Sequence, residues 1–156
     1  MVQIREAKTS RLVSSARDLI KEYSVSLGID LSFQDFDKEM AEFPAHYTRP
    51  DGRVFVAVEQ GEAVGVVGVR MFSRRVCELK RMYVRPEFRG KGVGRMLAER
   101  AIREAREIGY DRMRLDTLSR LKEAVSLYSS LGFKEIPPYR ANPNKGVVYM
   151  ELELGT

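Results

Sequence analysis

Apolar residues recur along the chain with the spacing of helices in some stretches and of strands in others. Between Leu12 and Leu27, Gly94 and Ile108, and Leu121 and Leu131, apolar positions return every three or four residues. This spacing predicts three amphipathic helices. A shorter helix is predicted from Gln34 to Phe43, where Pro44 stops it. Thr9 or Ser10 is suited to cap the first helix, and three glycines stand where helices end: Gly28, Gly109 and Gly132.

The segments between these helices read as strands. They are short and apolar or alternate between apolar and polar residues, and they lie at residues 2–7, 53–59, 63–71, 77–84, 112–116, 133–136 and 146–154. Gln60-Gly61-Glu62 predicts a hairpin turn. Gly65 and Gly68 predict a bulge or a close approach of backbones in the strand that contains them. The mixture of helices and strands predicts an α/β domain.

Length and composition place the chain among globular proteins. Its 156 residues are 44% hydrophobic and 31% charged, which fits one domain over residues 1–156. No apolar run approaches the ~20 residues that span a bilayer, and the first residues lack the apolar centre of a signal peptide. A single cysteine excludes an internal disulfide and fits a cytoplasmic protein. The sequence predicts neither a metal site nor a membrane partner.

The most informative stretch is Arg89-Gly90-Lys91-Gly92-Val93-Gly94, between the strand at 77–84 and the helix that ends at Ile108. Alternating glycines let a backbone turn tightly and approach a ligand. The N–H groups at the start of a helix have no partners within it and favour anions. The net charge is +5, with a local excess of basic residues from Lys80 to Arg95. The stretch therefore predicts a pyrophosphate cradle; the alternative is a glycine-rich connection with solvated basic residues.

This stretch resembles motif A of the GNAT superfamily of acyltransferases, whose loop reads [RQ]-x-x-G-x-[GA]. The resemblance covers the whole chain, with motif B at LDTLSRLKEAVSLYSSLGF. It is particularly similar to a bacterial group of uncharacterised acetyltransferases that carry FQ-x-F, ELKR and Y-x-x-NP, here at Phe33–Phe36, Glu78–Arg81 and Tyr139–Pro143. It implies an α/β (α+β) fold with a mostly antiparallel mixed sheet and about four flanking helices. The sheet is expected to splay between the strand at 77–84 and the next one, where the cofactor enters.

The resemblance implies acetyl-CoA as the cosubstrate and transfer of its acetyl group to a primary amine. The residues it assigns to the cofactor are Met82, Val84, Arg89, Gly90, Lys91, Gly92, Val93, Gly94, Arg95 and Ser119. Met82 and Val84 are expected to act through their backbones, one N–H facing the thioester oxygen. Ser119 stands near the place where many members of the family have an asparagine just before the motif B helix.

Glu78 and Tyr128 are the candidate catalytic residues. Glu78 lies in an apolar-flanked strand, where a raised pKa would suit a general base. Its alternative role is an ion pair with a nearby Arg or Lys. By resemblance, Tyr128 points at the sulfur of CoA and acts as the acid, since a phenol is protonated at neutral pH. The alternative is a core tyrosine on the apolar face of its helix.

The acceptor site is expected near the loop before the last strand and near residues 33–47. The residues assigned to it are Phe33, Tyr139, Arg140 and Asn142. Arg140 can read a carboxylate on the substrate, and the alternative is an ordinary proline-rich turn. The expected acceptor is a small-molecule or peptide amine, with no nucleic acid partner. The resemblance leaves a homodimer open.

Two other functions compete with acetyl transfer. A dinucleotide-binding oxidoreductase fragment is disfavoured because the glycines follow G-x-G-x-G rather than G-x-G-x-x-G. A GNAT-like module that binds acyl-CoA without turnover is harder to exclude from sequence. Two single residues carry little weight. Cys77 is more typical of a small buried hydrophobe than of a nucleophile, and a lone loop histidine such as His46 is usually incidental.

Overall fold

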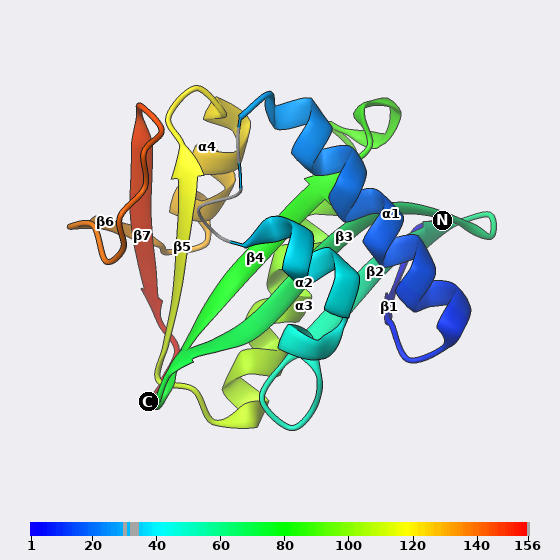
Figure 1. The fold of residues 1–156 in the computed structure, drawn as a ribbon, viewed down its shortest axis with the longest axis horizontal. Coiled ribbons are helices and arrows are strands. Elements are labelled where there is room, and N and C mark those ends of the chain that lie inside the picture. The colour runs from blue at the N-terminus through cyan, green and yellow to red at the C-terminus, as the bar shows by residue number, and fades with distance from the viewer. Residues whose placement is uncertain (30, 32–34, 156) are drawn as a thin grey trace.

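The computed structural model describes residues 1–29, 31 and 35–155, and its centre is a seven-stranded sheet (Figure 1). The strands are β1 Gln3–Glu6, β2 Arg53–Glu59, β3 Glu62–Ser73, β4 Val76–Val84, β5 Arg112–Leu118, β6 Lys134–Ile136 and β7 Val147–Glu153. Their spatial order is β1-β2-β3-β4-β5-β7-β6. Only β4 and β5 pair in parallel within this sheet. The predicted mostly antiparallel mixed sheet is confirmed.

Helices cover both faces of the sheet. They are α1 Ser10–Leu27, α2 Phe36–Glu42, α3 Val93–Ile108 and α4 Lys122–Ser130, with short 3-10 turns η2 Ala45–Tyr47 and η3 Pro86–Phe88. Figure 1 shows α1 and α2 in front of the sheet and α3 behind it. The core is accordingly split, with one cluster under α1 and α2 and a larger one around α3.

The ends and buried faces of the long helices follow from their residues. The Thr9 hydroxyl accepts a hydrogen bond from the Leu12 N–H at 3.2 Å, and Gly28 ends α1 in the left-handed region. Gly109 ends α3 in the same way, with a φ of 109°. The apolar stripe predicted for α3 is buried against the sheet, with Leu97 and Ala101 fully inaccessible. These caps and stripes fix where β4 and α3 meet, which is where the glycine loop lies.

Strand β4 departs from the predicted alternation. Alternation places four side chains on one face: Glu78, Lys80, Met82 and Val84. In the structure Arg81 has a φ of 58°, and the pairing with β3 shifts between Lys80↔Gly68 and Tyr83↔Val66. Three steps along β4 therefore match two along β3, which is a β-bulge.

The bulge reverses the faces of the residues after it. Met82 and Val84 pack into the α3 cluster, while Tyr83 packs into the α1–α2 cluster. Arg81 pairs with Glu39 of α2, on the same side as Tyr83. The prediction of one shared face is thus wrong beyond Lys80, because an inserted residue changes the parity of a period-two pattern.

Candidate active site

Strands β4 and β5 separate after a short stretch of pairing. They pair only from Val76–Glu78 to residues 112–114, after which β5 continues along β7. A pocket that is partly open to solvent lies in this split. Its walls come from residues 79–81 of β4, residues 116–118 of β5, and Tyr23 of α1. The splay predicted between these two strands is therefore present, and it opens a pocket lined by charged groups.

The glycine loop lies at the end of β4, where α3 begins. Gly90 and Gly92 have φ angles of 75° and 82°, in the left-handed region that favours glycine. A Cβ added to either residue meets nothing within 4 Å, so space is open in front of the loop. Gly92 is the N-cap residue of α3, whose first-turn N–H groups lack intrahelical acceptors. This is the geometry of an anion site, and it fits the pyrophosphate of a CoA ester.

The basic residues around the loop are exposed and partly engaged. Arg89 donates from Nε to the Val84 carbonyl at 2.8 Å, and Arg95 donates to the Ser130 hydroxyl of α4 at 2.6 Å. The Lys91 ammonium lies 5.5 Å from the centre of the Phe88 ring. Arg95 also lines a groove between α3 and α4. The predicted cofactor loop is thus flanked by positive charge and leads into that groove.

The backbone of Val84 lies at the edge of β4 that faces the split, and its contact with the cofactor stays a prediction. The Arg85 N–H donates to the Val64 carbonyl of β3. Because successive N–H groups of a strand point to opposite edges, the Val84 N–H points away from β3, toward the split. The Val84 carbonyl, on that same edge, accepts the Arg89 hydrogen bond. One fixed N–H donor therefore faces the region where a thioester would lie.

Ser119 is held by the loop before β7. Its N–H donates to the Gly146 carbonyl at 2.7 Å, and a Cβ on Gly146 would approach the Ser119 hydroxyl to 2.8 Å. The backbone of Ser119 is therefore engaged by this loop, and the contact explains why residue 146 is a glycine. The cofactor contact assigned to Ser119 stays a prediction that only its side chain can fulfil.

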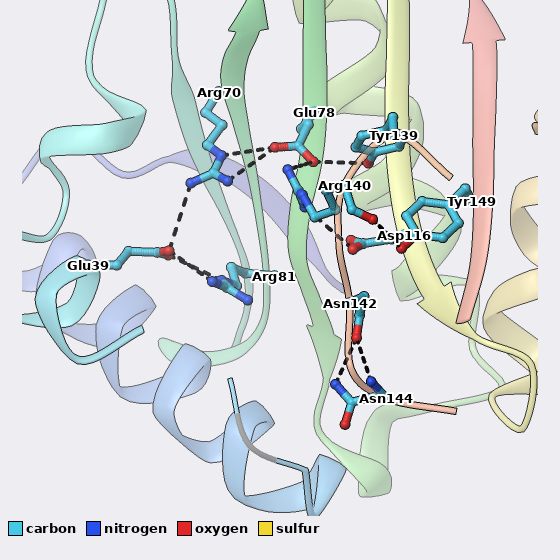
Figure 2. Close-up of polar contacts among 10 residues, drawn as sticks. All are labelled: Glu39, Arg70, Glu78, Arg81, Asp116, Tyr139, Arg140, Asn142, Asn144 and Tyr149. Carbon is cyan, nitrogen blue, oxygen red and sulfur yellow. Dashed lines mark hydrogen bonds and ion pairs between the residues drawn. The ribbon is translucent and has the colours of Figure 1, made fainter. Parts of the chain in front are cut away.

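Beside the pocket, six charged side chains form a chain in which arginines and carboxylates alternate (Figure 2). In order they are Arg81, Glu39, Arg70, Glu78, Arg140 and Asp116. Glu78 is central and only 1% exposed. Its Oε1 lies 3.1 Å from Nη2 of Arg70, and its Oε2 pairs with Arg140 and accepts from the Tyr139 hydroxyl at 3.0 Å. The ion pair left open as an alternative for Glu78 is present.

The predicted upward shift of the Glu78 pKa is wrong. Burial by itself raises this pKa, but the surrounding cations Lys80, Arg140 and Arg70 outweigh it and lower the pKa to about 2. Glu78 is therefore an anion at neutral pH and a weak proton acceptor. The base role assigned to it stays a prediction, and the geometry favours a role in positioning Arg70 and Arg140.

Lys80 is the group of this region that titrates near neutrality. It is 4% exposed and lines the pocket. Burial, reinforced by Arg81, lowers its pKa to about 7 against the opposing attraction of Glu78 and Asp116. Lys80 stands within the ELKR motif, but the sequence pattern assigns no role to it. The largest cause of its lowered pKa is burial in the fold, and Asp116 and Arg70 act on it from other strands, so the motif alone does not reveal that pKa.

Tyr128 lies on α4, in the core cluster around α3. It is 4% exposed, and its ring packs edge-on against Phe133 with centroids 5.7 Å apart. Burial raises the pKa of its phenol, and the Tyr23 phenol, which lines the pocket, adds to the rise. Tyr128 is therefore protonated at neutral pH and can donate a hydrogen bond near the pocket. The sequence left open whether Tyr128 is a core residue or the hydrogen-bond donor to the CoA sulfur, and this position is compatible with both roles.

The loop before β7 brings three predicted acceptor-site residues to the split. Tyr139 and Arg140 contact Glu78, and Arg140 also reaches Asp116 at 3.4 Å. Asn142 lines the pocket and accepts from the N–H and the side-chain amide of Asn144. Phe33 lies outside the described residues. No sequence pattern pointed to Arg70 or Glu39. Their ion pairs connect α2 to the loop before β7 only because the fold brings these segments together.

The two residues given little weight stay outside this chemistry. Cys77 is buried, and burial raises its pKa to about 12, so it is not a thiolate at neutral pH. His46 lies 3.4 Å from Glu42 on the surface of α2 and η2. Within the described ranges, no cluster of metal-ligating side chains occurs, and no helix is long and apolar enough to cross a bilayer.

Comparison with known proteins gives the class of this fold and site. The Acetyltransferase (GNAT) family matches residues 16–133, and the chain belongs to this family. An uncharacterised N-acetyltransferase of Schizosaccharomyces pombe is 42% identical over 98% of this chain and 95% of its own length. The N-acetylaspartate synthetase of Danio rerio is 38% identical over 73% of this chain and 42% of its own length.

Solved structures share the fold at lower identity. A GNAT acetyltransferase of Staphylococcus aureus has a TM-score of 0.80 at 20% identity, covering 99% of both chains. An acetyltransferase of Salmonella typhimurium, solved with its cofactor acetyl-CoA, has a TM-score of 0.73 at 24% identity, covering 99% of this chain and 94% of that one. The protein is an N-acetyltransferase that uses acetyl-CoA. The dinucleotide-binding interpretation is excluded.

Proposed function

We propose that the protein transfers the acetyl group of acetyl-CoA directly to the primary amine of a small molecule or peptide bound in the β4–β5 split. One observation carries this proposal: the pocket in the split lies between the strand that ends at the glycine loop and the strand that leads to α4. Cofactor and acceptor can therefore meet without a covalent enzyme intermediate. The inert Cys77 thiol is consistent with direct attack.

The residues at the split can serve each step of the transfer. The amine nitrogen attacks the thioester carbon, and the Val84 N–H donates to the oxygen as it becomes negative. The carbon–sulfur bond then breaks, its electron pair goes to sulfur, and Tyr128 donates a hydrogen bond to the departing thiolate. The amine nitrogen loses its second proton as the amide forms, the thiolate takes up a proton, and CoA leaves as the thiol.

The amine must lose a proton before or during attack. We assign this proton to neutral Lys80, which lines the pocket and has a pKa of about 7. Glu78, with a pKa of about 2, is the weaker candidate. A pH–rate profile distinguishes them. If the acidic limb of the profile, near pH 7, persists in Glu78→Gln, the base is Lys80. If that limb disappears in this variant, the base is Glu78.

The function is tested by following thiol release from acetyl-CoA with a panel of amines. The panel contains amino acids, polyamines, aminoglycosides and a peptide with a free N-terminus. L-Aspartate is included in the panel because some relatives of this chain are named N-acetylaspartate synthetases. We expect release with one chemical class of amine. Binding of acetyl-CoA without release by any amine would instead support a module that binds the cofactor without turnover.

Replacing Gly92 by Asp should weaken acetyl-CoA binding by about 10- to 100-fold, a loss of roughly 1.4–2.8 kcal/mol. The residue is the N-cap of α3 with a φ of 82°, so a carboxylate there stands where the pyrophosphate is expected. Calorimetric titration with acetyl-CoA measures the change.

The matched control for Gly92→Asp is Gly92→Asn, which has the same size and a similar tolerance of positive φ but no charge. We expect Gly92→Asn to bind acetyl-CoA more tightly than Gly92→Asp. Equal dissociation constants for the two variants would show that charge at this position does not matter, and the pyrophosphate would have to be placed elsewhere.

A further inference from the structure

The chain of alternating charges has two ends, and both reach the acceptor pocket. Among the described residues its contacts run from Arg81 through Glu39, Arg70, Glu78 and Arg140 to Asp116. Arg81 and Asp116 both line the pocket in the split. Figure 2 shows the chain crossing from the α2 side of β4 to β5. A ligand in the pocket therefore lies next to an arginine from β4 and an aspartate from β5.

The guanidinium at the first end is held firmly. Arg81 is 3% exposed at its side chain, with Nη2 2.9 Å and Nε 3.2 Å from the two oxygens of Glu39. The hydroxyl of Tyr47 donates to Glu39 at 2.7 Å, which holds that carboxylate in turn. Arg81 occupies the bulge of β4 with a φ of 58°. Bulges re-aim side chains next to active sites, and this one turns Arg81 toward Glu39.

The carboxylate at the other end is held less completely. Asp116 is 8% exposed at its side chain, and its contact with Nη1 of Arg140 is 3.4 Å long. Arg140 also pairs with Glu78, so its charge is shared between two carboxylates. A buried carboxylate whose guanidinium partner is this distant and is shared with Glu78 is a favourable place for the cation of a ligand.

Lys80 lies beside this chain of side chains, and while its amine is neutral the charges along the chain are balanced. Three guanidinium groups, Arg70, Arg81 and Arg140, match three carboxylates, Glu39, Glu78 and Asp116. Binding a lone cation or a lone anion would leave one buried charge uncompensated, which is costly. A ligand that brings one charge of each sign preserves the balance. A polyamine brings only positive charge and fits poorly.

From this arrangement we infer that the acceptor is an α-amino acid, with its carboxylate paired to Arg81 and its ammonium group paired to Asp116. The inference rests on the proposed function and names its substrate class. The ammonium group passes a proton to the neutral amine of Lys80. The resulting amine attacks the acetyl carbon, and the electron pair of the carbon–sulfur bond goes to sulfur. The nitrogen loses its second proton, the CoA thiolate takes up a proton, and the products are an N-acetylamino acid and the CoA thiol.

The test compares acceptors that differ only at the carboxylate. L-Leucine, L-leucinamide and isoamylamine share a side chain that suits the leucine-lined wall of the pocket, formed by Leu27, Leu31, Leu118 and Leu121. We expect kcat/KM for L-leucine to exceed that for isoamylamine by about 100-fold, because a charge-assisted pair is lost with the carboxylate. L-Aspartate is measured in parallel.

Arg81→Gln and Asp116→Asn separate recognition from folding. In Arg81→Gln we expect KM for L-leucine to rise by about tenfold or more, while isoamylamine changes by less than about twofold. A general loss of structure would move both acceptors together. Asp116→Asn should raise KM for both, because both carry the ammonium group. Arg106→Gln, on the exposed end of α3, is the matched control and should change neither.

Three outcomes would overturn the inference. Isoamylamine as good as L-leucine with wild type would show that no carboxylate is read, even though acetyl transfer itself stands. If the ratio of kcat/KM for L-leucine to that for isoamylamine is unchanged in Arg81→Gln, the carboxylate is bound elsewhere. The milder Arg81→Lys variant serves for this test if Arg81→Gln does not fold. If no amine releases thiol, the proposed function fails, and the binding of L-leucine to the protein–CoA complex is titrated instead. Absence of L-leucine binding would then overturn the inference about the acceptor as well.

Discussion

Tyr128→Phe should lower kcat by about 10²- to 10⁴-fold while leaving the dissociation constant of acetyl-CoA nearly unchanged. The substitution removes only the hydroxyl, and the phenylalanine ring can keep the contact with Phe133. Because burial raises the pKa of this phenol, its proton is present throughout the neutral range. The expected loss is therefore that of a hydrogen bond to the thiolate as it departs. Steady-state kinetics and calorimetry on the same preparation separate turnover from binding.

The matched control is Tyr110→Phe. Tyr110 is also buried, and its hydroxyl donates to the Asp51 carbonyl at 2.7 Å on a different part of the molecule. Removing that hydroxyl should reduce stability slightly and leave kcat unchanged. If Tyr128→Phe keeps kcat within twofold of wild type, Tyr128 is a packing residue and the sulfur receives its hydrogen bond from another group.

Glu78→Gln should destabilise the fold by about 3 kcal/mol, because it removes the carboxylate between two arginines that are mostly buried. Arg70 and Arg140 are 20% and 17% exposed at their side chains, so water replaces the lost partner only in part. Urea unfolding at neutral pH measures the change. Glu62→Gln is the control, since its pair with Arg85 is exposed and should contribute about 0–1 kcal/mol.

The stability difference between wild type and Glu78→Gln should depend on pH in one direction. The pKa of Glu78 is about 2 in the folded protein and near 4.5 when the group is unperturbed. A lowered folded-state pKa gives stability that is complete above about 4.5 and is lost as the pH falls toward about 2. The difference should therefore be largest at neutral pH and shrink between those values. A difference that is constant down to pH 3 would mean that the ion pairs of Glu78 contribute little.

Local sequence patterns predicted the elements of this protein well. The caps Thr9 and Gly28, the stripe of α3 and the glycine loop depend on neighbours within about one or two helical turns, where chain geometry is regular. The bounds differ by a few residues at β1 and α2, where weak ends are decided by packing. The splay of β4 from β5 came from the family resemblance.

The electrostatics of the site could not be predicted in the same way. Glu78 was expected to have a raised pKa because its sequence neighbours are apolar, and burial does act in that direction. The opposing charges are Lys80 on the same strand, Arg140 from the loop before β7 and Arg70 from β3, and the last two meet Glu78 only in the fold. A pKa depends on charges within a few ångströms, whichever segment supplies them.

The sequence by itself determined the fold class and the family, and it predicted the glycine loop as the cofactor site and the segments that meet at the β4–β5 split. These follow from periodicity, glycine placement and a family motif. Only the tertiary structure decided which side chains meet. One bulge at Arg81 reverses the faces of β4 and aims that arginine at Glu39. The fold then joins six charges from five segments into one chain that ends in the pocket at Arg81 and Asp116. Period-two alternation cannot foresee an inserted residue, and sequence distance does not report distance in space.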